Sequence, residues 1–171
     1  MSFEIDISSS QNTLPIDVRA LTQSIERALL IEHVASAVLS VSVVDNKAIH
    51  QINREHLQHD YPTDVISFQL EFASDDDAPD DAPAELRAAG AMIEGEIIAS
   101  AEMAAEMASS GQWTAMNELT LYVIHGLLHI CGYDDLSAAE KAIMRTRERA
   151  ILNALGLNPV YPCDETSQES A

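Results

Sequence analysis

The chain has 171 residues, of which 47% are hydrophobic and 22% charged, as expected of one globular domain with a substantial core. It has no apolar run of the ~18–20 residues that a membrane span needs, no N-terminal secretory signal and only two cysteines, so we expect a cytoplasmic protein without a disulfide framework. Its 28 acidic and 9 basic residues give a formal net charge of −19, which argues mildly against a nucleic-acid partner because phosphate backbones attract basic proteins. The acids are unevenly distributed, however, so the net charge is a poor guide to the local field.

Strands and helices alternate in the first part of the chain. Residues 3–8 alternate between apolar and polar as a strand does, and residues 15–34 show helical spacing after a proline. Residues 37–44 form a valine-rich strand, and Asp45 is the expected N-cap of a helix that ends near residue 57.

Two more strands follow, at residues 63–70 and 94–100. The segment between them includes residues 71–85, which hold seven acidic side chains and no basic one. Such a segment can bury little surface, so we expect a solvated loop that is not needed for folding.

The rest of the chain is predicted to be helical, over residues 101–107, 114–131 and 137–155. Because the strands come early and the helices gather late, we expect an α+β fold with helices packed against a small mixed β-sheet. This single domain should occupy residues 1–160 and be followed by a flexible acidic tail over residues 161–171.

Residues 125–135, HGLLHICGYDD, have the spacing of a metal site. His125 and His129 lie four residues apart and project from the same face of a helix, so both imidazoles can bind one ion. Gly132 offers the left-handed turn that ends a helix, and Asp135 follows at the distance where a third ligand is needed. Three protein ligands leave a coordination position open for water, as in hydrolytic metal sites. We therefore predict that a divalent ion binds in the C-terminal half of the domain, with zinc as the preferred candidate.

The alternative is a buried helix that happens to contain histidine, because an HxxxH pair alone often arises by chance. Gly132 and Asp135 at these offsets favour the metal site, and Ser137 with Glu140 already supplies the N-cap of the next helix. Cys131 projects about 200° away from His129 on the helix, so we interpret it as a core residue and not as a fourth ligand.

The same stretch resembles the signature of the YbeY family of bacterial rRNA maturation factors, which are metal-dependent endoribonucleases. Residues 53–68, NREHLQHDYPTDVISF, resemble the second block of the family, and GEI at residues 95–97 resembles its next strand. The resemblance implies a nuclease, with His125, His129 and Asp135 as the ligands of one zinc ion, or of another divalent metal, per chain. It also implies that single-stranded ribosomal RNA is the substrate, cut at the 3′ end of the small-subunit rRNA, with small-subunit proteins as further partners.

Two positions depart from the pattern of the family: Asp135 stands where the third ligand is usually histidine, and Leu57 stands where an arginine is usual. Carboxylate is an accepted zinc ligand. Arg54 and His59 lie near Leu57 and are candidates for contact with RNA phosphate.

A basic stripe is a second candidate surface for RNA. Lys141, Arg145 and Arg149 recur every four residues and share one face of the last helix, whereas the alternative is that they pair with neighbouring acids. No residue is identified as the general acid or base.

Two other functions compete with the nuclease. HxxxHxxGxxD is the ligand frame of zinc peptidases, but Gly126 occupies the position of the glutamate that serves as their base. The other alternative is a non-catalytic ribosome-assembly factor with a structural metal, which would bind RNA without turning it over.

Overall fold

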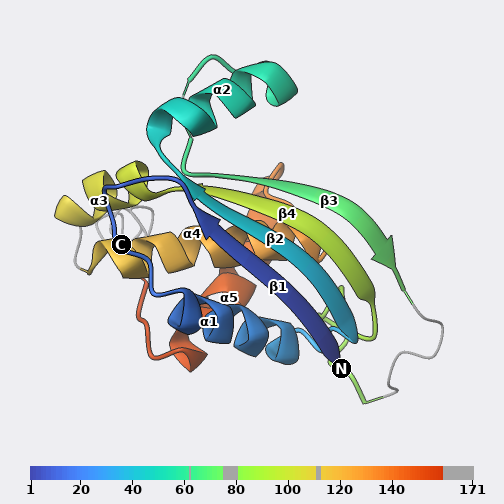
Figure 1. Ribbon diagram of the computed structural model, residues 1–171. Helices are drawn as coiled ribbons and strands as arrows, with labels where there is room; N and C mark the ends of the chain where they lie inside the picture. Colours follow the sequence, from blue (N-terminus) through green and yellow to red (C-terminus); the bar gives the residue numbers. More distant parts are fainter. Residues whose placement is uncertain (62, 75–80, 111–112, 160–171) are drawn as a thin grey trace, which may run out of the picture.

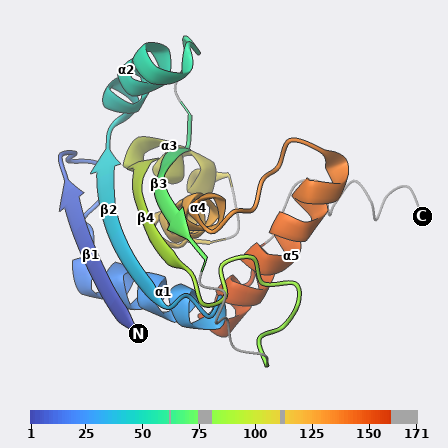
Figure 2. The same ribbon diagram turned by 90° about the vertical axis from the view of Figure 1, so that its right-hand side faces the viewer.

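The computed structural model describes residues 1–61, 63–74, 81–110 and 113–159, which form a single α+β domain (Figures 1 and 2). The strands are β1 (Ser2–Ser9), β2 (Ser36–Val44), β3 (Val65–Ala73) and β4 (Met92–Ser100). The helices are α1 (Val18–Ile31), α2 (Asn46–Leu57), α3 (Ala101–Ser109), α4 (Ala115–Ile130) and α5 (Ala138–Ala154). The predicted fold class is therefore confirmed.

The four strands form one mixed sheet in the order β1-β2-β4-β3. β1, β2 and β4 run parallel, and β3 pairs with β4 in the antiparallel direction. Helices α1, α4 and α5 lie on one side of this sheet, whereas α2 lies at one end of it (Figure 2).

Alternation along the strands decides which face of the sheet is covered. On β2 the side chains of Ala37, Leu39, Val41 and Val43 are buried, and the residues between them are more exposed. Helix α4 completes the core with side chains that are fully buried: Leu119, Val123, Ile124, Leu127, Leu128 and Ile130. Burial of each large apolar side chain contributes about 1.5–3 kcal/mol, so this layer holds α4 firmly on the sheet.

Two glycines let α4 lie unusually close to the strands. A Cβ atom at Gly126 would lie 3.0 Å from Ile97 Cγ2, and one at Gly95 would lie 2.8 Å from the Phe68 carbonyl oxygen. It would also lie 2.5 Å from Cδ1 of Ile130, at the end of α4. At Gly95 the backbone carbonyl leaves no room for a Cβ atom, whereas at Gly126 the neighbouring side chains would have to move by a few tenths of an ångström.

Two differences from the expected boundaries have a clear physical reason. α1 begins at Val18 because the Asp17 carboxylate accepts a hydrogen bond from the Ala20 N–H, so Pro15 precedes the helix. β3 continues to Ala73, so the expected loop over 71–85 loses its first three residues to a paired strand in which Phe72 packs against the core. Residues 75–80 of that loop and the predicted tail over 161–171 lie outside the described residues.

None of the helices in the described part of the chain is long and apolar enough to span a membrane.

Candidate metal centre

The end of α4 brings the three predicted ligands together. Thr114 caps the start of the helix through the Asn117 N–H, and His125 and His129 lie on its last two turns. The helix ends at Gly132, whose φ is +96°, with hydrogen bonds from the Gly132 N–H to the His129 carbonyl and from the Tyr133 N–H to the Leu128 carbonyl. This pair of bonds is a Schellman motif, which turns the chain back so that Asp135 faces the histidines.

The distances between the ligand atoms fit a small divalent cation. Nε2 of His125 lies 3.2 Å from Nε2 of His129, and Oδ2 of Asp135 lies 3.5 Å and 3.8 Å from these two nitrogens. A triangle with these sides has a circumradius of about 2.0 Å, close to the ~2.0–2.2 Å that separates zinc from nitrogen and oxygen ligands. The group of His125, His129 and Asp135 could therefore hold a metal ion with little movement.

Both imidazoles are oriented by an acceptor on the side away from the ligand atoms. Nδ1 of His125 donates to Oε2 of Glu148 at 3.0 Å, and Nδ1 of His129 donates to the Tyr133 carbonyl oxygen at 3.1 Å. A proton on Nδ1 leaves the Nε2 lone pair for a metal, and such partners normally accompany metal-binding histidines. The tautomers of both histidines therefore fit a metal ion, as do the distances between the ligand atoms.

Burial and nearby carboxylates set the protonation of the two histidines. Burial lowers the pKa of His125, but the Glu148 carboxylate and Asp135 outweigh it, so the pKa ends above its ordinary value. Burial and the neighbouring His125 lower the pKa of His129, and Asp135 offsets this only in part. Glu148 is only 3% exposed, so its charge acts on His125 with little screening by water.

A second buried acid, Glu32, stabilises the turn at Gly132 through Tyr133. Glu32, at the end of α1, is fully buried, and its Oε1 accepts bonds of 2.9 Å and 2.7 Å from Nε and Nη2 of Arg147. Its Oε2 accepts a bond of 2.7 Å from the Tyr133 hydroxyl. Because the carbonyl of Tyr133 holds His129, this Glu32–Arg147–Tyr133 network links α1 and α5 to the ligand set.

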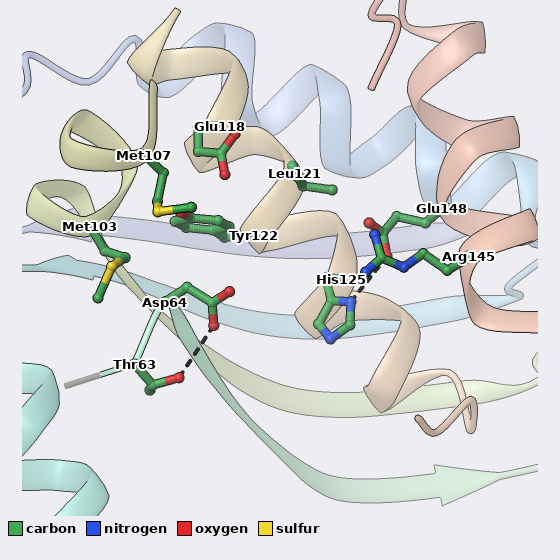
Figure 3. A pocket seen from close by; sticks show the side chains of 10 residues that line it. All are labelled: Thr63, Asp64, Met103, Met107, Glu118, Leu121, Tyr122, His125, Arg145 and Glu148. Carbon is green, nitrogen blue, oxygen red and sulfur yellow. Dashed lines mark hydrogen bonds and ion pairs between the residues drawn. The ribbon is translucent and has the colours of Figure 1, made fainter. Parts of the chain in front are cut away.

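A cavity of about 450 Å³ opens beside His125 (Figure 3). It lies between α3, α4, α5 and the segment before β3, and it is lined by Thr63, Asp64, Met103, Met107, Glu118, Leu121, Tyr122, His125, Arg145 and Glu148. A cavity of this size next to a possible metal ion is the natural place for a substrate.

The residues predicted to contact RNA fall in different places. Arg145 lines the cavity, and Lys141 is exposed one turn earlier on α5. Arg54 and His59 are exposed and are not among the residues that line the cavity beside His125. Leu57 is the last residue of α2 and is 41% exposed. A role in RNA contact stays a prediction for all four charged or imidazole side chains.

The sequence interpretation missed Glu148, Asp64 and the Glu32–Arg147 pair. Glu148 stands in the apolar stripe of α5 with Met144, Ile151 and Leu152, and a carboxylate in such a stripe is a sign of a buried partner. Asp64 lies within the TDVISF segment, but it lines the cavity together with side chains of α3, α4 and α5, and these contacts have no local sequence signal.

The peptidase alternative loses support at Gly126. The glycine is buried against Ile97 and Val65, whose Cγ2 atoms would lie 3.0 Å and 3.2 Å from a Cβ atom there. A glutamate at this position would displace these side chains and would begin against the sheet, so the base of an HExxH enzyme does not fit here without rearrangement.

The chain is similar to proteins of one family. The family model described as Endoribonuclease YbeY matches residues 6–156. The chain is 42% identical to the protein named Endoribonuclease YbeY of Rhodopirellula baltica over 86% of this chain and 69% of that one. It is 37% identical to the protein of the same name from Bacillus licheniformis, over 92% and 98% of the two chains.

The fold is also similar to the solution structure of TM1509 from Thermotoga maritima, with a TM-score of 0.53 and 22% identity. That likeness covers 88% of this chain and 91% of the other. The family model spans most of the chain, including all three candidate ligands, so the chain belongs to the Endoribonuclease YbeY family.

Proposed function

We propose that this protein is a metal-dependent endoribonuclease that hydrolyses phosphodiester bonds in single-stranded RNA. The observation that carries the proposal is the triangle of His125 Nε2, His129 Nε2 and Asp135 Oδ2, whose sides match the ligands of one small cation. The names of the relatives support the choice of RNA as substrate. The proposed biological substrate is the 3′ end of the small-subunit rRNA, with ribosomal small-subunit proteins as further partners.

His125, His129 and Asp135 would hold the ion, which we propose is zinc. A zinc ion in such a site supplies a water of lowered pKa and a positive charge for a phosphoryl oxygen. The chain's own residues orient the site: Glu148 fixes the His125 ring, and the Tyr133 carbonyl fixes the His129 ring. Arg145 lines the cavity beside His125, which supports a role for its guanidinium in binding a phosphate of the substrate.

The test compares Asp135→Asn with Asp134→Asn. Both substitutions remove one negative charge from neighbouring residues, but the Asp134 carboxylate accepts a bond from the Leu136 N–H and is not one of the three candidate ligands. Zinc content is measured by elemental analysis, and cleavage is measured on an unstructured RNA with and without a chelator.

We expect one zinc ion per chain, cleavage that stops after chelation, and a loss of at least tenfold in zinc affinity for Asp135→Asn alone. Cleavage that survives complete removal of metal would contradict the proposal. RNA binding without turnover by the zinc-loaded protein would instead favour a non-catalytic assembly factor.

A further inference from the structure

The cavity beside His125 extends along α4 away from the candidate metal ligands (Figure 3). Tyr122 lies one turn before His125 and Glu118 one turn before Tyr122, so they are displaced along the helix axis by about 4.5 Å and 10.5 Å. The cavity therefore reaches about one nucleotide from the place where a phosphodiester would meet the metal ion.

The walls of the cavity suit a flat apolar surface. Met103 and Met107 face it from α3, and Leu121 and Tyr122 face it from α4 (Figure 3). Met107 is 48% exposed, so a group from solvent can reach this wall. Unstacked bases of single-stranded RNA bind to surfaces of this kind, through contact with their faces and hydrogen bonds to their edges.

The negative charge of the cavity disfavours a phosphate in the part between α3 and Asp64. Three carboxylates line it, those of Asp64, Glu118 and Glu148. Among the described lining residues the one Lys or Arg is Arg145, which lies at the His125 end (Figure 3). An anion is therefore favoured at the metal end, whereas the part between α3 and Asp64 favours an uncharged group that donates hydrogen bonds.

Asp64 is the carboxylate placed to accept such a bond. Glu148 already accepts from His125, and Oε2 of Glu118 accepts from Nε1 of Trp113 at 2.6 Å. Oδ1 of Asp64 accepts from the Val65 N–H at 2.8 Å and from the Thr63 hydroxyl at 3.3 Å. These two bonds fix the side chain, and its other oxygen points toward the cavity (Figure 3).

We propose that this cavity binds one unpaired nucleobase next to the scissile phosphate, and that Asp64 accepts a hydrogen bond from the exocyclic amino group of that base. Adenine, cytosine and guanine carry such a group, and carboxylates accept from it in other recognition sites. Uracil has no exocyclic amino group. Its one donor on that edge, N3–H, stands between two carbonyl oxygens whose partial negative charges are repelled by a carboxylate. The inference rests on the proposed function and adds a base preference to it.

The experiment uses a zinc-loaded protein and an unstructured RNA with one randomised nucleotide, and sequencing of the product ends gives the cleavage rate beside each base. We expect cleavage beside adenine, cytosine or guanine to be about tenfold faster than beside uracil. A factor of this size corresponds to the free energy of one hydrogen bond to a charged acceptor. In Asp64→Asn the amide oxygen still accepts from the Val65 N–H, while the amide nitrogen presents a donor to the cavity. The preference against uracil should then fall below about twofold or reverse.

Asp60→Asn is the matched control, because it removes the same charge from the same connecting segment. Asp60 pairs with His50 at 2.8 Å and does not line the cavity, so this variant should keep the preference of the wild-type protein. Equal rates beside all four bases in the wild type would overturn the base subsite alone. The base subsite would also be overturned if Asp64→Asn lowered the cleavage rate by the same factor at every base, because Asp64 would then act on the reaction itself. If the zinc-loaded wild type cleaves no RNA, the proposed function fails and the subsite fails with it.

Discussion

The buried Glu32–Arg147 pair offers a quantitative test of how the domain supports its candidate metal centre. Glu32 is fully buried, and the guanidinium of Arg147, itself 14% exposed, makes two short bonds to one of its oxygens. Arg147→Met keeps the apolar stem but leaves the carboxylate with the Tyr133 hydroxyl as its one remaining side-chain partner among the described residues. Breaking a buried pair in this way costs about 3–5 kcal/mol, and the remaining hydroxyl bond places our estimate near 3 kcal/mol. For a domain of this size we expect the melting temperature to fall by about 6–12 °C.

Urea unfolding of the metal-free protein, followed by circular dichroism, measures this free energy. Arg149→Met is the control, since Arg149 is exposed two residues further on, and its loss should cost less than about 1 kcal/mol. The double variant Glu32→Gln with Arg147→Met should be more stable than Arg147→Met alone, because no unpaired charge stays buried. The reasoning is refuted if Arg147→Met unfolds within 1 kcal/mol of the wild type, or if the double variant is less stable than Arg147→Met.

Three further predictions concern the ligands and their support. Glu148→Ala removes the acceptor of His125 Nδ1, so zinc affinity by competition with a fluorescent chelator should fall about 10–100-fold; an unchanged affinity would show that the ring needs no such partner. Gly95→Ala places a methyl group against the Phe68 carbonyl and should cost about 1–3 kcal/mol in urea unfolding, whereas a neutral result would mean that the strand can shift. Asp135→His raises the charge of a zinc-loaded site from about +1 to about +2, so the acid limb of the pH–rate profile should move to lower pH; an inflection at the same or higher pH would show that the surroundings set it.

Local sequence rules predicted the elements well where one signal dominated. β2 alternates strictly and is buried on one side, and Asp45 caps α2 by accepting from the Ala48 N–H, as its position indicated. Gly132 adopts the left-handed conformation that the spacing after His129 required. Cys131 is buried and unpaired, in agreement with its interpretation as a core residue. Each of these features depends on neighbours within a few positions, and the sequence displays those neighbours directly.

The features that sequence reasoning missed depend on contacts between distant segments. Glu32 and Arg147 are 115 residues apart, and the residues next to Arg147 in the sequence gave no indication that its side chain turns inward. Asp64 lines a cavity whose opposite wall comes from α3, so its place could not be read from its own segment. Local spacing grouped the candidate ligands, whereas the residues that support them and shape the neighbouring cavity required the three-dimensional fold.

The close packing of α4 on the sheet has a consequence for how the candidate metal site can vary. Gly126 directly follows His125, and its contact with Ile97 and Val65 fixes the rotation of the helix about its own axis. The direction of both imidazoles is thereby set by apolar atoms on β3 and β4 that never meet the ion. Substitutions at positions 65 and 97 would therefore tune metal affinity from the opposite face of the helix. Redesign of the site for another cation could begin in this apolar layer, with the ligands left unchanged.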